Sequence, residues 1–335
     1  MVLLLSDDDV VATVVGRDEF RRAVEALESS FVAYESGETS APATAFGTYP
    51  RGASTYAEVE QSLNVPVGLV PSLDAMSLGI VTVRRDHVTR PHSMWQLLFS
   101  YETSALLALI EDSVLHHFQV GGQFGVAARW LTAPDAGTVA MIGAGKMARA
   151  SLRAIAAVRD LREVKVYSPT PSSRQRFAEE MTELVGVPVR AVDSAEEAVR
   201  DTEIVQCATN AEVRGDTQVL DADWVAPGAL VATMSRNELG EDIAKIARII
   251  PGAAEHVPTV RPDWQPWKQL MESGQLPHLG PDMGAIVAGN APAREGDDII
   301  NVFLGSGVPS HRPAIAVWLY REALEKGTGT TWDLD

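Results

Sequence analysis

Residues Thr138–Arg159 read TVAMIGAGKMARASLRAIAAVR, and they are the most informative segment of the chain. The opening residues, Thr138–Ile142, are small or apolar and long enough for one buried strand. Residues 143–148 match a G-x-G-x-x-A turn, after which apolar residues recur at helical spacing. A strand, a glycine turn and a helix in this order are the context that a dinucleotide-binding fingerprint requires.

Each small residue of this turn has a physical purpose in such a site. Gly143 permits a tight turn, Gly145 lets the backbone approach a pyrophosphate, and Ala148 lets the helix pack closely on the strand. The helix N-terminus adds unpaired N–H groups and the positive end of the helix dipole. The alternative is an ordinary strand-to-helix turn without a ligand. We expect a nucleotide site made by Gly143, Ala144, Gly145, Lys146 and Met147.

The segments after this turn alternate between strand and helix. Apolar runs predict strands, and amphipathic runs predict helices. Ser194 with Glu197 predicts a capping box at the start of one helix. This rhythm indicates a Rossmann-type doubly wound parallel sheet with helices on both faces. The predicted strands are 138–142, 164–167, 187–192, 204–208, 230–234 and 299–304, and the predicted helices are 147–159, 172–185, 195–199 and 242–249.

The first third of the chain has a different pattern. Asp18–Tyr34 has the apolar spacing of an amphipathic helix, but helices do not alternate with the strands that follow it. We therefore expect a second, α+β domain with a mixed or antiparallel sheet. The predicted strands there are 2–5, 78–83, 95–100 and 105–110, and further helices are predicted at 116–131 and 313–326.

Composition limits the classes of function. A length of 335 residues favours two domains, and a net charge of −17 disfavours nucleic acid and anionic membrane surfaces as partners. One cysteine excludes a disulfide framework within the chain and a thiolate zinc cluster. The first residues lack the pattern of a signal peptide, and no apolar run is long enough to span a membrane. We expect a cytoplasmic protein with a small-molecule substrate.

The end of the second parallel strand predicts which cofactor binds. An acidic residue there would bond both ribose hydroxyls of NAD, but residues 166–174 read VYSPTPSSR, without an acid. Ser168, Thr170 and Arg174 offer the hydroxyls and the guanidinium that a 2′-phosphate needs. In the alternative, Ser172 is only a helix cap and Arg174 is a solvated residue. We favour NADP(H) over NAD(H).

With these motifs, the chain resembles the ornithine cyclodeaminase/mu-crystallin family over nearly its whole length. The strongest segments are 139–177, Cys207-Ala208-Thr209-Asn210, 224–229, 278–280 and 302–307. The resemblance implies a nucleotide domain inserted between two parts of a second domain, which forms a homodimer. We place the substrate and dimerisation domain at 1–117 together with 311–335, and the NAD(P)-binding domain at 118–310. The resemblance also implies that Cys207, Ala208, Thr209 and Ser235 contact the cofactor.

The substrate side departs from the family pattern. The family's lysine after the L-G-x strand is Val81 here, and an arginine that holds a substrate carboxylate is Gln119. An early family arginine falls on Thr44, with Arg51 close enough in sequence to replace it. A buried substrate carboxylate without a cation is costly, so we do not expect an α-amino or α-imino acid substrate.

The family's catalytic aspartate falls on Ser235 or Asn237, and neither can act as a carboxylate base. His116 and His117 precede Gln119 and could donate a proton to a carbonyl or imine, although a histidine at a helix entry is the plainer interpretation. The predicted catalytic residues are His116, His117, Asn237 and Arg51.

The sequence therefore predicts an NADP(H)-dependent oxidoreductase that acts on a C=N or C=O bond. Two alternatives remain open: a non-catalytic NADP(H)-binding protein of mu-crystallin type, and a cyclodeaminase whose catalytic residues have been replaced from elsewhere in the chain.

Overall fold

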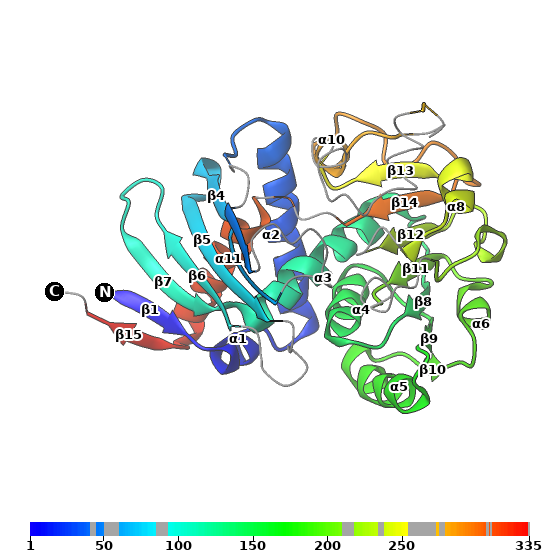
Figure 1. Cartoon of the computed structure of the whole chain (residues 1–335), viewed down its shortest axis with the longest axis horizontal. Coiled ribbons are helices and arrows are strands. Elements are labelled where there is room, and N and C mark those ends of the chain that lie inside the picture. The colour runs from blue at the N-terminus through cyan, green and yellow to red at the C-terminus, as the bar shows by residue number, and fades with distance from the viewer. Residues whose placement is uncertain are drawn as a thin grey trace. The chain divides into compact units, whose positions relative to one another are not determined.

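The computed structural model describes residues 1–40, 45–49, 60–84, 93–209, 218–233, 238–253, 273–274, 279–305, 308 and 310–333. The chain divides into two compact units (Figure 1). The first comprises Met1–Gln119 with Val308–Asp335, and the second Val120–Gly307. The sequence suggested boundaries after residues 117 and 310. Helix α3 (Asp112–Leu131) contains the first boundary and begins before the predicted 116.

The first unit is built on an eight-stranded sheet with the order β15-β1-β7-β6-β5-β3-β2, and β4 pairs with β5 beside this path. β1 runs parallel to β7 and every other pairing is antiparallel, so the sheet is mixed, as predicted. The strands are β1 (Val2–Leu5), β2 (Ala45–Tyr49), β3 (Gln61–Val65), β4 (Val67–Val70), β5 (Ala75–Arg84), β6 (Ser93–Phe99), β7 (Leu106–Glu111) and β15 (Thr330–Trp332).

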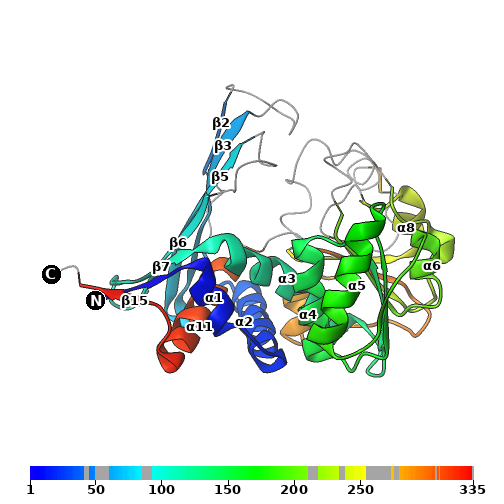
Figure 2. The ribbon, with the colours of Figure 1, turned by 90° about the horizontal axis from the view of Figure 1, so that it is seen from below.

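Three helices lie on one face of this sheet: α1 (Asp7–Thr13), α2 (Arg17–Glu35) and α11 (His311–Lys326) (Figure 2). α2 confirms the predicted amphipathic helix, since Phe20, Leu27 and Phe31 are fully buried along one side of it. α11 packs on α2 and on strands β4, β5 and β6. It ends at Gly327, whose left-handed backbone is a common helix terminator. A short 3-10 turn, η1 (Pro71–Leu73), joins β4 to β5.

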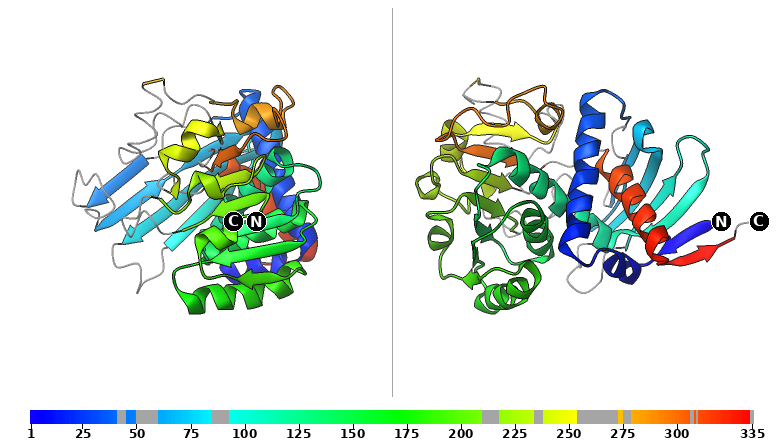
Figure 3. Two further views of the ribbon diagram at one scale, coloured as in Figure 1. Left: turned by 90° about the vertical axis from the view of Figure 1, so that its right-hand side faces the viewer. Right: turned by 180° about the vertical axis from the view of Figure 1, so that it is seen from behind.

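The second unit is built on a seven-stranded, wholly parallel sheet with the order β10-β9-β8-β11-β12-β14-β13 (Figure 3). The strand order reverses beside β8, and in such folds ligands bind at the carboxyl ends of the strands at this point. The strands are β8 (Thr138–Ile142), β9 (Glu163–Tyr167), β10 (Val189–Ala191), β11 (Ile204–Cys207), β12 (Leu230–Thr233), β13 (Arg248–Pro251) and β14 (Asn301–Leu304). The helices are α4 (Lys146–Val158), α5 (Pro171–Val185), α6 (Ala195–Val199), α8 (Glu241–Ile246) and α10 (Met283–Val287), with a 3-10 turn η2 (Ala222–Trp224).

The predicted helix over 242–249 is wrong in its second half. α8 ends at Ile246, and Arg248–Pro251 forms β13, which pairs with β14 from Asn301 to Leu304. Ile249 and Ile250 are buried in this strand, and a short apolar run of this kind does not distinguish a buried strand from a helix. No helix in the described ranges combines the length and apolar character needed to cross a membrane.

The predicted capping box at α6 is half correct. The Ser194 hydroxyl accepts a hydrogen bond from Glu197 N at 3.0 Å, as in such a box. The return bond from the Glu197 carboxylate goes to the amide of Asp193 at 3.3 Å instead of that of Ser194. Ser172 is not a helix cap either, because α5 begins at Pro171 with Thr170 as its N-cap.

Candidate functional site

The glycine turn between β8 and α4 is shaped by close backbone packing. The Gly143 amide donates to the Tyr167 carbonyl at 2.8 Å, and its φ of +117° is one that L side chains rarely adopt. A Cβ at this position would also overlap the Ala208 carbonyl oxygen. Only glycine fits here, which agrees with the tight-turn role predicted from the sequence.

Gly145 has the opposite surroundings. It is the N-cap of α4, and nothing lies within 4 Å of the position that its Cβ would take. Lys146 is exposed and Met147 half-buried at the start of the helix, while Ala148 is fully buried beneath it. An open backbone approach at the N-terminus of a helix fits the pyrophosphate of a dinucleotide.

Arg149, which sequence reasoning missed, braces this turn. Its Nη1 donates to the Ala144 carbonyl at 2.6 Å, and its Nε and Nη2 donate to Glu180 of α5 at 2.8 and 2.5 Å. The guanidinium lies 5.1 Å from the centre of the Phe177 ring. These contacts fix the Ala144 peptide of the turn that would face the pyrophosphate. The only signal of this role in the sequence is an arginine in the first turn of the helix.

At the end of β9 the predicted phosphate-binding residues lie together, and Arg174 is already bonded. Its Nη1 donates to the Ser168 carbonyl at 3.0 Å, and its Nη2 donates to the exposed Asp193 carboxylate at 2.5 Å. The guanidinium is 5.9 Å from the Tyr167 ring centre and mostly buried. The Thr170 side chain makes no capping hydrogen bond. Arg174 is therefore an anchored residue, and Asp193 is an acidic neighbour that the sequence pattern did not reveal.

At the carboxyl ends of β11 and β12 lies a third residue that sequence reasoning missed. Glu238 is fully buried, and its carboxylate accepts hydrogen bonds from Thr209 and Thr233. Burial, and secondarily the nearby Glu238 charge, raises the pKa of the Cys207 thiol well above its ordinary value. Cys207 is thus an inert packing residue, and Ala208 and Thr209 follow it at half-buried positions.

The described structure includes two of the four predicted catalytic residues. His116 and His117 lie on α3, and both are half-buried. Arg51, Asn237 and Ser235 fall outside the described residues. Their roles stay predictions.

A Rossmann-type parallel sheet with a glycine-turn cradle, joined to a unit with a mixed sheet, defines a nucleotide-binding protein of two units. A model of the ornithine cyclodeaminase/mu-crystallin family matches residues 9–327. The chain therefore belongs to this family, and the resemblance inferred from the motifs is confirmed.

Similar proteins are named for reactions of imines and amino acids. Delta(1)-pyrroline-2-carboxylate reductase of Bacillus cereus is 28% identical over 284 residues, which cover 83% of this chain and 87% of that protein. Iminosuccinate reductase of Paracoccus denitrificans is 27% identical over 244 residues, 70% of this chain and 72% of that protein. Reductases and dehydrogenases among the relatives support an oxidoreductase that acts on an imine or an amino acid.

The solved structure of Thermococcus litoralis Delta(1)-pyrroline-2-carboxylate reductase in complex with NADH and L-proline shares the fold. It matches with a TM-score of 0.84 at 24% identity and covers 99% of this chain and all of that one. The predicted fold class, a parallel sheet with a second unit around a mixed sheet, is confirmed.

Proposed function

We propose that this protein is an NADP(H)-dependent oxidoreductase that acts on a C=N or C=O bond, or on the matching amine, of a small molecule other than a standard α-amino acid. The observation that carries the proposal is the open backbone at Gly145, set at the N-terminus of α4 beside the strand-order reversal. The imine reductases among its relatives support the reaction class.

The chain's own residues would bind the substrate and supply a proton. A bound nicotinamide dinucleotide supplies the hydride, and a histidine can protonate the nitrogen or oxygen that accepts it. We assign this donor to His116 or His117, and substrate orientation to Arg51 and Asn237. Replacing the donor histidine by glutamine should lower kcat about 100-fold, whereas replacing the other should leave kcat nearly unchanged.

The preference for NADP(H) rests on Arg174. Residues 166–174, at and directly after the end of β9, include no acidic side chain for the ribose, and the Arg174 guanidinium is held there by the Ser168 carbonyl. The 2′-phosphate would take the place of the exposed Asp193 carboxylate as the partner of Arg174.

Dissociation constants for NADPH and NADH measured by calorimetry test this preference. Wild type should prefer NADPH, and Arg174→Ala should weaken NADPH about tenfold or more while it changes NADH little. Asp193→Asn is the matched control, because it removes the competing charge and should keep or increase the preference. A wild type that prefers NADH would refute this part of the proposal alone.

The substrate class is tested by NADPH consumption with a panel of imines and ketones. The panel pairs the uncharged ring Δ1-pyrroline with Δ1-pyrroline-2-carboxylate, and adds iminosuccinate and simple ketones. We expect turnover with the uncharged compounds, because Val81 and Gln119 replace cations that would hold a carboxylate. Turnover of carboxylates alone would contradict this. NADPH binding without any turnover would favour the non-catalytic alternative, and ammonia release without net cofactor change would favour the cyclodeaminase.

We also propose that the protein is a homodimer formed through the first unit's sheet. Among the described residues, the helices α2 and α11 pack on one face only. The other face carries a row of half-buried leucines, Leu78, Leu97 and Leu109, which lie opposite one another on β5, β6 and β7. Contiguous apolar side chains on an open sheet face are typical of an interaction surface.

A further inference from the structure

The buried carboxylate of Glu238 joins the ends of two neighbouring strands. Its Oε1 accepts hydrogen bonds from the backbone amide and the hydroxyl of Thr209, at 2.6 and 2.7 Å. Its Oε2 accepts from the Thr233 hydroxyl at 2.6 Å. Thr233 is the last residue of β12 and pairs with Cys207, the last residue of β11. Glu238 therefore fixes the carboxyl edge of both strands.

This edge is continuous with the glycine turn. The Ala208 amide donates to the Ile142 carbonyl at the end of β8 at 2.8 Å, and the Ala208 carbonyl occupies the space that a Cβ at Gly143 would need. Thr209 follows directly. A shift of Thr209 would therefore move the neighbouring Ala208 carbonyl, which packs on Gly143 in the turn that would face the pyrophosphate.

The opposite edge of the sheet holds a carboxylate with similar bonds and no place in a ligand site. Glu203 accepts from the amides of Gly137 and Thr138 at 2.8 and 2.9 Å, and from the Thr138 hydroxyl at 2.8 Å. These bonds lie at the amino ends of β8 and β11, and the Glu203 side chain is 39% exposed. Burying a carboxylate fully, as at Glu238, costs more than leaving it partly solvated. The costly, fully buried carboxylate is therefore the one at the carboxyl edge of the sheet, where parallel sheets bind ligands.

We propose that Glu238 is a positioning residue for the nicotinamide half of the cofactor. It holds Thr209, and through it the segment 207–209, beneath that half of the dinucleotide. The two halves of a bound dinucleotide lie on either side of the strand-order reversal. The β9 side, with Ser168 and Arg174, takes the adenosine half, so the β11 and β12 side takes the other. This inference rests on the proposed cofactor binding.

The test compares two ligands by calorimetry: NADPH, and adenosine 2′,5′-bisphosphate, which contains only the adenosine half. Glu238→Ala should weaken NADPH about tenfold, the scale of one lost hydrogen bond to a charged group, and leave the bisphosphate within about twofold. Glu238→Gln should keep NADPH affinity near wild type, because its amide oxygen can still accept both Thr209 bonds. Glu203→Ala is the matched control and should lower Tm without changing either affinity.

Equal weakening of both ligands by Glu238→Ala, or no weakening of either, would overturn the positioning role. So would a loss of NADPH affinity in Glu203→Ala as large as in Glu238→Ala. If Glu238→Ala does not fold, Thr209→Val carries the same comparison, with a selective loss of NADPH affinity as the supporting result and no selectivity as the refuting one. If wild type prefers NADH, the ligands become NADH and 5′-AMP. A wild type that binds neither dinucleotide refutes the proposed function itself.

Discussion

Gly143 and Gly145 belong to one turn, yet the structure predicts opposite consequences for the same substitution. Gly143→Ala places a Cβ against the Ala208 carbonyl at a strained φ, so it should destabilise folding by about 2–4 kcal/mol. Gly145→Ala meets no atom within 4 Å, and its Cβ enters only the space proposed for the pyrophosphate. It should keep Tm near wild type and weaken NADPH about tenfold or more. Thermal unfolding and calorimetry on both variants check this, and a Gly145→Ala variant with unchanged NADPH affinity would exclude a cofactor at this turn.

His311 is a buried histidine whose titration should affect stability. Its Nδ1 lies 2.6 Å from the Ser30 hydroxyl, its ring packs edge-on against Phe31, and burial lowers its pKa from 6.5 to about 3. The unfolded chain binds a proton below pH 6.5 that the folded chain does not bind until about pH 3, so stability falls as the pH drops through this window. Wild type should lose about 2 kcal/mol more than His311→Asn between pH 7 and pH 5. Urea unfolding at both pH values measures this, and parallel losses would contradict it.

Some site residues could be predicted from the sequence, and others could not, for one physical reason. Gly143, Gly145 and Ala148 act within a local strand-turn-helix unit, so their spacing reveals them. Glu238 and Asp193 matter because folding brings them to Thr209 and Arg174, and no local pattern reports such a contact. The family resemblance placed the catalytic aspartate on Ser235 or Asn237, and the buried carboxylate belongs to the next residue, Glu238.

At the scale of helices and strands, elements with their own periodicity were predicted well. α2 and α11 were found from apolar spacing, the β8–α4 unit from the apolar runs on either side of its glycine turn, and the alternation after β8 correctly indicated a parallel sheet. β13 was missed because its identity depends on pairing with β14, which lies far along the chain. Strands specified mainly by a distant partner carry little signal of their own.

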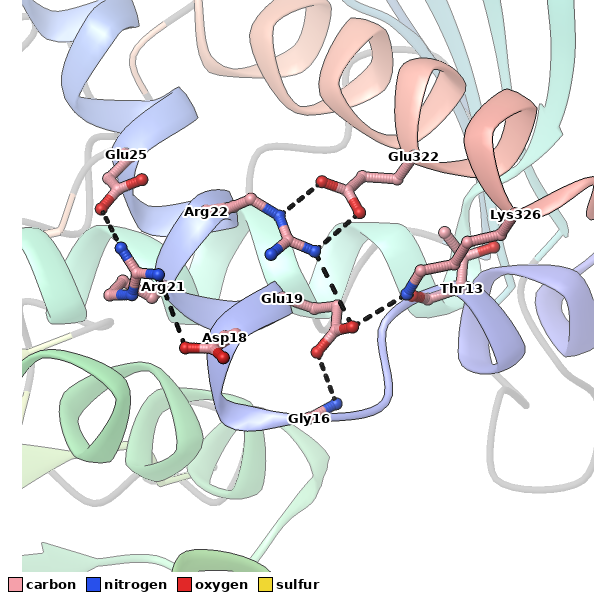
Figure 4. A network of polar contacts seen from close by, with 9 residues as sticks. All are labelled: Thr13, Gly16, Asp18, Glu19, Arg21, Arg22, Glu25, Glu322 and Lys326. Atoms are coloured by element: carbon pink, nitrogen blue, oxygen red, sulfur yellow. Dashed lines mark hydrogen bonds and ion pairs between the residues drawn. The ribbon is translucent and has the colours of Figure 1, made fainter.

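The packing of α2 against α11 depends on a polar network that joins their ends (Figure 4). Lys326 donates to the Glu19 carboxylate at 2.9 Å and to the Thr13 carbonyl at 2.7 Å, and Arg22 pairs in two bonds with Glu322 at 2.6 and 2.9 Å. The hydrogen bond from Lys326 is the largest cause that lowers the pKa of Glu19 from 4.5 to about 2.

This depressed pKa predicts how the network depends on pH. The stabilisation is complete above pH 4.5, the ordinary value, and disappears as the pH falls towards 2. Lys326→Met should lower stability by about 1 kcal/mol at pH 7, and the difference from wild type should shrink below pH 4.5. Urea unfolding from pH 7 to pH 3 measures it. A difference that stays constant with pH would show that the lysine stabilises only through its Thr13 bond.

At the scale of the whole molecule, the dimer proposal depends on the sheet face opposite α2 and α11, on which no helix of the first unit's described residues packs. Leu97 lies at the centre of the leucine row, between Leu78 on β5 and Leu109 on β7, and Trp95 on the same strand is 37% exposed. If this face meets its copy across a two-fold axis, the leucine row of one protomer packs on the leucine row of its partner. A charge at the centre of the row would then be buried without a partner.

Leu97→Asp should therefore give a monomer of 36.0 kDa where wild type shows twice that mass in light scattering. Leu184→Asp is the matched control, because Leu184 is 57% exposed on α5 in the other unit and should leave the dimer intact. Each partner would carry an unpaired carboxylate into the interface, and the cost of its desolvation opposes association. The variant should dissociate at every micromolar concentration tested while its circular dichroism stays that of the folded chain. A monomeric wild type, or a Leu97→Asp variant that remains a dimer, would place the interface elsewhere or remove it.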